Sequence, residues 1–235
     1  MPLPYEHPLW RTVMGEALHP GGKALSLRLL DLCGFSSGTA VLDAGCGGGA
    51  TLELLQEQGV RAVGLDRSSD LLCRAAAKGP VMKGDLRRIP FGEGIFEGVV
   101  CECVLSLQES LFPVLGEIAR VLRHGGRLGV TDLFRRRGEP CGGGGESCAQ
   151  GARSRKELET ALSEHGFALL LFEDHSALLR ECTARLVWEG ILEPPRPPCR
   201  SLGYGLWVCR RENASGVDNA ERRECFSPDT PERVR

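Results

Sequence analysis

The sequence predicts an α/β fold: a doubly wound sheet of about seven strands, mostly parallel with the last strand antiparallel, and helices on both faces. Short apolar runs alternate with amphipathic helical patterns along most of the chain. Several of the early runs end in an acidic residue. The first, Val41 to Asp43, passes directly into a stretch with four glycines in residues 45–49, which is typical of a buried strand, a tight turn and a helix start.

Composition limits the class of protein. The chain has 235 residues, 42% hydrophobic and 26% charged, which suits one domain with modest appendages. A net charge of -2 gives no general attraction to nucleic acid or to an anionic membrane. No apolar run is as long as a membrane span, and the first residues lack the pattern of a signal peptide. We therefore expect a cytoplasmic protein with a small-molecule partner; its oligomeric state stays open.

Cysteine usage agrees with a reducing compartment. The chain has eleven cysteines, an odd number, and no C-x-x-C pair. Reduced thiols are the norm in the cytosol, and the spacing does not support a structural zinc site. We therefore predict no metal.

The remaining elements follow from periodicity and from stop signals. Helices are predicted where leucines and other apolar residues recur at helical spacing, often before a glycine, and the expected helices are 24–34, 50–58, 71–79, 111–122, 154–165 and 177–191. Short apolar runs predict the other strands at 62–66, 80–83, 96–104, 127–133, 167–172 and 202–209.

Three regions are expected along the chain. Residues 1–37 would form an N-terminal helical lid segment and 38–211 the main domain. Residues 212–235 are polar and charged, which predicts a disordered tail. A second mobile segment is predicted at 134–151, because its four-glycine run has no use in packing.

The glycine run predicts a ligand site. Without Cβ atoms, residues 45 and 47–49 can adopt positive φ and let a ligand lie against the backbone. Asp43, two residues ahead, would repel a diphosphate but could hold an ammonium group or a bound water. Asp66 ends the next strand, where an acid can accept both hydroxyls of a ribose. Asp85 follows the third strand and could accept from an adenine amino group. A nucleoside joined to an amino acid fits this set.

These motifs occur in an order that resembles class I S-adenosylmethionine-dependent methyltransferases over roughly residues 38 to 135. The matching stretches are Asp43 to Gly49, Gly64-Leu65-Asp66, Gly84-Asp85-Leu86, Ile89-Pro90-Phe91 and Leu122 to Leu128. The resemblance implies a Rossmann-like fold and S-adenosylmethionine as cofactor. Carried onto this sequence, it implies that the cofactor is bound by Asp43, Gly45, Cys46, Gly47, Asp66, Arg67, Asp85, Leu86 and Cys101.

The acceptor side is less defined. The stretch from Ser154 to Leu179 resembles arsenite-type and quinone-type methyltransferases, which implies a small-molecule acceptor. An acceptor that must lose a proton needs a base, and the candidates are Glu102, His165 and His175. By the resemblance, Tyr5, His7 and Trp10 are candidate lid residues, with surface aromatics as the alternative.

Thiols suggest one specific acceptor class. Cys141 and Cys148 flank the four-glycine run, and thiolates select soft acceptors such as trivalent arsenic. The alternative is that both are incidental loop thiols. Cys46, inside the glycine motif, is expected to be a small packing residue rather than a nucleophile.

Two rival functions stay open. The chain could bind the cofactor without transferring a methyl group, as a sensor or an assembly protein. An NAD-dependent oxidoreductase would share the fold, but the spacing G-x-G-G-G and the preceding acid disfavour it.

Overall fold

The computed structural model describes residues 15–136, 148–191 and 201–212. Their centre is a seven-stranded sheet in the order β3-β2-β1-β4-β5-β7-β6. The strands are β1 (Ala40–Ala44), β2 (Arg61–Asp66), β3 (Val81–Lys83), β4 (Phe96–Glu102), β5 (Leu122–Arg135), β6 (Phe167–Asp174) and β7 (Leu202–Arg211). β1 to β5 pair in parallel, whereas β7 runs antiparallel to both β5 and β6. The predicted fold class is confirmed.

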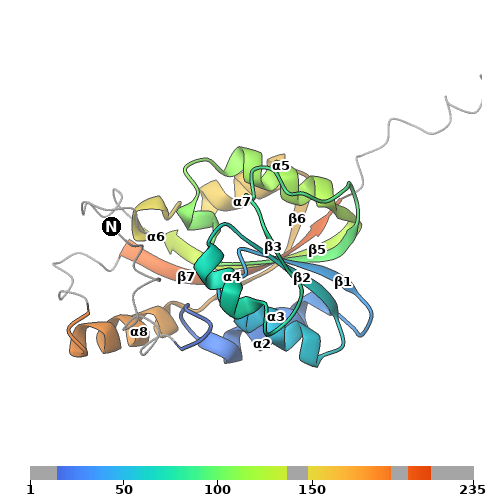
Figure 1. The fold of residues 1–235 in the computed structure, drawn as a ribbon. Coiled ribbons are helices and arrows are strands. Elements are labelled where there is room, and N and C mark those ends of the chain that lie inside the picture. Colours follow the sequence, from blue (N-terminus) through green and yellow to red (C-terminus); the bar gives the residue numbers. More distant parts are fainter. Residues whose placement is uncertain (1–14, 137–147, 192–200, 213–235) are drawn as a thin grey trace, which may run out of the picture.

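Helices cover both faces of this sheet (Figure 1). They are α2 (Gly22–Cys33), α3 (Ala50–Glu57), α4 (Ser69–Ala75), α5 (Leu111–Val121), α6 (Cys148–Gly151), α7 (Arg155–Glu164) and α8 (Ser176–Trp188), with a short 3-10 helix η2 (Leu105–Leu107). α5 and α7 lie on one face, and α2, α3 and α8 lie on the other. Among the described residues, no helix combines the length and the apolar character needed to cross a bilayer.

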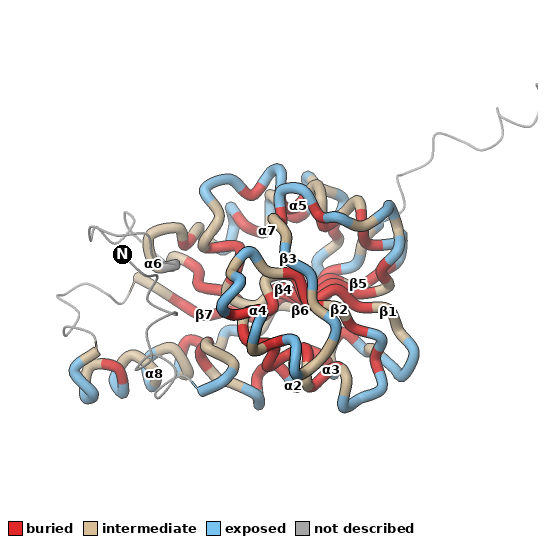
Figure 2. The backbone as a smooth tube through the Cα atoms, viewed as in Figure 1, coloured by how far each residue is buried: buried red, intermediate tan, exposed pale blue. Residues whose placement is uncertain are grey.

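Each face has its own hydrophobic core, seen as buried segments along the strands and the inner helix faces in Figure 2. Leu115 and Ile118 of α5 are fully buried against the sheet on one side. Leu29 and Leu30 of α2 are buried on the other, together with Leu55 of α3. Burial of such a side chain stabilises the fold by roughly 1.5–3 kcal/mol.

α2 lies against the middle of the sheet. A Cβ at Gly129 of β5 would come within 2.7 Å of Cys33 Sγ and 3.0 Å of Leu29. Glycine is therefore needed at this contact. Residues 15–21, which precede α2, are described, whereas Tyr5, His7 and Trp10 lie outside the described residues. The lid segment and the domain boundary at residue 37 stay predictions.

Some element ends differ from the predicted ones. α4 ends at Ala75 rather than near Gly79, where a Cβ would come within 3.0 Å of Leu52 on α3. β5 begins earlier than predicted because Leu122 pairs with Phe96 of β4, and it ends later because its pairing with β7 continues to Arg135. The start of α7 is as predicted: Ser154 accepts from the Glu157 amide, and Glu157 accepts from the Ser154 amide.

Candidate functional site

A cavity of about 670 Å³ opens at the carboxyl ends of β1, β2 and β4, on the side where the strand order reverses. Its volume is in the range of roughly 300–1,000 Å³ that is usual for small-molecule sites. The wall consists of the turns after β1, β2 and β3, the end of β4 with η2, residues 16–19 ahead of α2, and the end of α6.

The structure brings most of the predicted cofactor residues to this cavity. Eight of the nine line it, namely Asp43, Gly45, Cys46, Gly47, Asp66, Arg67, Asp85 and Leu86. Cys101 does not, because its side chain is fully buried in the core on the α5 side of the sheet. Side chains alternate along a strand, so Glu102, the last residue of β4, faces the opposite side from Cys101 and lines the cavity. Cys103 follows the end of the strand and also lines the cavity.

The glycine turn needs its glycines for two different reasons. Gly45 and Gly49 have φ of 84° and 78°, and a Cβ would collide with Val104 at Gly45 and lie 2.9 Å from Ala75 at Gly49. Gly47 also has positive φ, 52°, but a Cβ there would meet no protein atom within 4 Å. Because Gly47 lines the cavity, this open space is part of the cavity rather than of the packed fold.

Cys46 has the packing role predicted for it. Its side chain is 8% exposed and packs with Leu72 and Ala75 of α4. Burial raises the pKa of its thiol, so the thiol is protonated and a poor nucleophile. Glycine is required opposite it, since a Cβ at Gly64 would lie 2.6 Å from the Cys46 sulfur.

Asp66 ties the glycine turn to the start of α4. One carboxylate oxygen accepts from the Gly47 amide at 2.9 Å, and the other accepts from the Ser68 amide at 2.8 Å. Each oxygen has two lone pairs, so each can accept a further hydrogen bond from a ligand. The carboxylate is thereby held at the cavity wall, where a diol could bridge its two oxygens.

Asp85 is ionised at the far side of the cavity. Arg87 donates to both of its oxygens, with Nε distances of 3.0 and 3.1 Å. These hydrogen bonds, the Arg87 charge and nearby Arg67 lower the pKa of the Asp85 carboxyl to about 2. Because both groups are half exposed, the pair contributes little to stability. Its carboxylate is available to a donor on a ligand.

Asp43 is the buried acid of the site. Its side chain is 3% exposed, and its Oδ2 has no hydrogen-bond partner in the structure. Burial, followed by repulsion from Glu102 and Asp66, raises the pKa of Asp43 well above its ordinary value. An unpaired buried oxygen on a cavity wall is a place where a ligand donor or a bound water is expected.

The raised pKa of Asp43 predicts a pH-dependent cost to folding. The folded state keeps a proton that the unfolded chain loses above about pH 4, so stability is lost as pH rises toward the folded-state pKa. We expect Asp43→Asn to stabilise the ligand-free protein by about 1 kcal/mol or more at pH 8, and less at pH 5. Urea unfolding of parent and variant at both pH values measures this, and an equal gain at both would contradict it.

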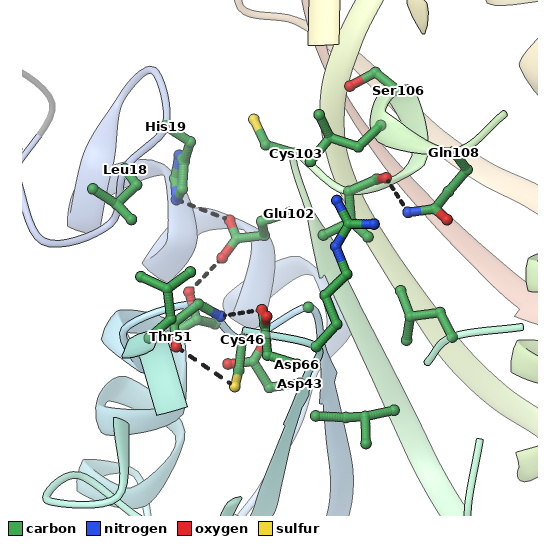
Figure 3. A pocket seen from close by; sticks show the side chains of 18 of the residues that line it. Leu18, His19, Asp43, Cys46, Thr51, Asp66, Glu102, Cys103, Ser106 and Gln108 are labelled. Atoms are coloured by element: carbon green, nitrogen blue, oxygen red, sulfur yellow. Dashed lines mark hydrogen bonds and ion pairs between the residues drawn. The ribbon is translucent and has the colours of Figure 1, made fainter. Parts of the chain in front are cut away.

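Glu102 is the centre of a buried polar network. Its side chain is 7% exposed, and its carboxylate accepts from the hydroxyls of Ser26 on α2, Thr51 on α3 and Thr131 on β5. His19 Nε2 lies 3.5 Å from a Glu102 oxygen and 3.1 Å from Ser26 Oγ. Figure 3 shows His19, Glu102 and Thr51 in a row along the cavity wall. Three elements and the segment before α2 thus converge on one carboxylate.

The histidine at the cavity is one that sequence reasoning missed as a site residue. His19 is 3% exposed and lines the cavity, whereas His165 and His175 do not. His165 bonds the Ala161 carbonyl at the end of α7, and His175 pairs with Glu173. The turn residues Pro20, Gly21 and Gly22 after His19 signalled only a helix start. Nothing local indicated that this helix would bring His19 to the end of β4.

The role predicted for the two loop thiols stays a prediction. Cys141 lies outside the described residues, and Cys148 begins α6 with a side chain that also lies outside them. Cys103 lines the cavity, but Cys182 on α8 does not. Among the described residues, no group of three or more histidine, cysteine or acidic side chains is arranged to bind a metal ion.

Backbone strain occurs at the cavity. Leu18 and Cys103 have φ of 58° and 54°, and within the described part of the chain they are the non-glycine residues with positive φ. Both line the cavity. Such conformations cost of order 1–3 kcal/mol and cluster at functional sites. At Cys103 the conformation is held by a hydrogen bond of 2.7 Å, which the Cys103 amide donates to the Thr131 carbonyl.

Comparison with known proteins identifies the central region. Residues 42–130 match a family described as a methyltransferase domain. This region is similar to a methyltransferase domain, and the match covers less than half of the chain. A solved structure with this fold, a Haemonchus contortus phosphoethanolamine N-methyltransferase in complex with S-adenosylmethionine, has a TM-score of 0.70 at 18% identity. The family match begins in β1 and ends in β5, so it contains all the strands whose carboxyl ends form the cavity, whereas His19 and Ser26 lie ahead of it.

Curated relatives of the methyltransferase domain act on different acceptors. A demethylmenaquinone methyltransferase of Mycobacterium bovis (strain BCG) is 36% identical over 53% of this chain and 47% of its own length. A malonyl-(acyl-carrier protein) O-methyltransferase of Pectobacterium atrosepticum is 33% identical over 45% of this chain and 43% of its own. The chain thus covers about half the length of these relatives.

Solved structures share the fold at low identity. A Haemonchus contortus phosphoethanolamine N-methyltransferase, in complex with S-adenosylhomocysteine, has a TM-score of 0.72 at 18% identity and covers 87% of this chain and 56% of its own. The cyclase SpnF has a TM-score of 0.68 at 20% identity, covering 80% of each chain. At these identities the likeness shows the fold, which alone does not determine a reaction.

Proposed function

We propose that this protein transfers the methyl group of S-adenosylmethionine to a small-molecule acceptor. The observation that carries the proposal is the placement of Asp43, Asp66 and Asp85 around one cavity, each at the end of its own strand or in the turn after it. A cavity lined by several acidic side chains favours a ligand that carries positive charge. The cofactor carries such charge on its sulfonium and ammonium groups. When bound, the cofactor supplies an electrophilic methyl group.

The residues present suit this cofactor. Asp66, held by two backbone amides, would accept the ribose hydroxyls, and Asp85 would accept the adenine amino group. The unpartnered Oδ2 of Asp43 has the position and the chemistry to receive a donor or a bridging water from the amino-acid part. Gly47 leaves open the space that a Cβ would fill. The bound geometry would supply alignment, which can lower a barrier by roughly 7–11 kcal/mol.

On the acceptor side, we propose a small molecule or a soft nucleophile. Glu102 and Cys103 line the cavity next to the cofactor residues, and Glu102 is the one base candidate from the sequence that the structure brings there. The two curated relatives take acceptors of different chemistry, so they do not specify this one. We also keep the sequence-based proposals of a cytoplasmic location and of no nucleic-acid partner.

Calorimetry and turnover together test the proposal. We expect S-adenosylmethionine and S-adenosylhomocysteine to bind with micromolar affinity, and S-adenosylhomocysteine to form when an acceptor panel of thiols, quinols, carboxylates, amines and arsenite is added. Binding without formation of S-adenosylhomocysteine across the panel would favour the rival function, a cofactor-binding sensor or assembly protein. Absence of binding to either compound would refute both.

A further inference from the structure

A chain of hydrogen bonds connects the Cys103 thiol at the cavity to the carboxylate of Glu102 through the protein interior. Cys103 Sγ lies 3.1 Å from the hydroxyl of Tyr204 on β7. The Tyr204 hydroxyl donates to Thr131 Oγ1 at 3.0 Å, and Thr131 donates to Glu102 at 3.3 Å. Tyr204 and Thr131 are both fully buried. Glu102 and Cys103 are adjacent in sequence, yet the bonds between them pass through two other strands.

The donors in this chain all point the same way. A carboxylate only accepts, so the Thr131 hydroxyl must donate to Glu102. Thr131 then accepts the Tyr204 proton, and the Tyr204 oxygen is left to accept from the Cys103 thiol. Each hydroxyl has one proton, and each is used in the direction from Cys103 to Glu102. The arrangement is therefore a continuous path for a proton that leaves the thiol.

The far end of the path can accept that proton. His19 Nδ1 lies 3.0 Å from the Pro20 carbonyl, so Nδ1 must carry a hydrogen. With a neutral ring, the Ser26 hydroxyl donates to Nε2, at 3.1 Å. With a charged ring, Nε2 donates to Ser26 and the same hydroxyl turns to Glu102, at 3.1 Å. With either the neutral or the charged His19 ring, each of these polar atoms has a hydrogen-bond partner. The network can therefore take up one extra proton without leaving a buried polar atom unpaired.

We propose that Tyr204, Thr131, Glu102, Ser26 and His19 form a proton relay that deprotonates the thiol of Cys103. In the transfer, the Cys103 proton passes to Tyr204 while the Tyr204 proton passes to Thr131 and the Thr131 proton to Glu102. Glu102 then returns to a carboxylate as His19 takes up a proton through Ser26. The products are a Cys103 thiolate and a His19 imidazolium, with charge and protons conserved. Tyr204 now donates back to the sulfur, which stabilises the thiolate.

Other ionisable groups surround the relay on several elements. Asp43 on β1 and Asp66 on β2 lie across the cavity, Asp132 lies on β5 beyond Thr131, and the Cys33 thiol lies on α2. Burial raises the pKa of Asp43 and Asp132, which diminishes their negative charge, and it raises the pKa of the Cys33 thiol to about 12. Asp132 accepts from the amides of Ser106 and Leu133 rather than from the relay.

The relay would give Cys103 the thiolate form, which its position at the cavity does not provide by itself. A thiolate is the nucleophilic and ligand form of cysteine, and it selects soft partners. The strained backbone of Cys103 presents its side chain to both the cavity and Tyr204. This inference concerns the ligand-free protein, so it stands or fails separately from the proposed methyl transfer.

The rate at which iodoacetamide alkylates Cys103 tests the proposal. The full chain is reduced and alkylated from pH 5 to 10, and peptide mass spectrometry with fragment ions distinguishes Cys103 from Cys101. Alkylation joins the sulfur to carbon and releases iodide, so its rate follows the thiolate. We expect Tyr204→Phe and Thr131→Val to be alkylated about tenfold more slowly than the parent at pH 7, and the pH at which the rate reaches half its maximum to be higher in both variants than in the parent.

Matched variants separate a relay from a structural network. Thr51→Val removes a donor from the Glu102 carboxylate and from Ser26 without interrupting the path from Cys103 to Glu102, so we expect it to slow alkylation less than Thr131→Val does. His19→Gln should slow alkylation, because it removes the final acceptor. Equal rates and midpoints in the parent, Tyr204→Phe and Thr131→Val would overturn the proposal. So would equal slowing by Thr51→Val and Thr131→Val. If Tyr204→Phe shows an altered unfolding midpoint, the alkylation rates of Thr131→Val and His19→Gln decide whether the relay exists.

Discussion

Gly47→Val is expected to weaken S-adenosylmethionine binding by more than about 100-fold, with only a modest loss of stability. Gly47 has φ of 52°, and its Cβ position faces open cavity rather than protein. A valine there would cost about 1–2 kcal/mol in backbone conformation, and its methyl groups would project into cofactor space. The new side chain would also crowd the amide that donates to Asp66. Isothermal titration with S-adenosylmethionine measures the loss.

Gly166→Val is the matched control for this variant. Gly166 also has positive φ, 76°, and a Cβ there would likewise meet no atom within 4 Å. It lies in the turn between α7 and β6, away from the cavity residues. We expect Gly166→Val to show the same small shift in unfolding midpoint and unchanged binding. Normal binding by Gly47→Val would mean that the glycine turn does not contact the cofactor.

Asp66→Ala is expected to weaken cofactor binding by about 10- to 100-fold, because a hydrogen-bonded carboxylate contributes about 1.5–3 kcal/mol. Two effects contribute: the ribose would lose its acceptor, and the amides of Gly47 and Ser68 would lose theirs. Asp66→Asn separates the two, since an amide keeps one acceptor oxygen and should give an intermediate affinity.

Asp70→Ala is the control for the loss of negative charge near the site. Asp70 is an exposed acid in the first turn of α4, four residues after Asp66, and does not line the cavity. We expect its removal to leave affinity within about twofold of the parent, since exposed charges contribute little. Similar losses in Asp66→Ala and Asp70→Ala would show that Asp66 acts only through its charge.

The acids and glycines that line the cavity could be predicted because their signals are local. Asp43 and Asp66 follow apolar runs, and parallel strands in one sheet bring their carboxyl ends to the same edge. Gly45 and Gly47 are typical of a turn with positive φ. The antiparallel orientation of β7 was predicted and is confirmed. Cys101 stays a predicted cofactor residue through its backbone atoms, because alternation along β4 sends its side chain into the core.

The sequence by itself determined the sheet, the glycine turn and the acids around it, because hydrophobic periodicity and turn residues act over a few neighbouring positions. Only the tertiary structure decided the polar network behind the cavity. His19, Ser26, Glu102, Thr131 and Tyr204 come from separate elements, spread over most of the chain. None of these residues has a local pattern that predicts its partner, because their hydrogen bonds exist only once α2, β4, β5 and β7 pack together and exclude water.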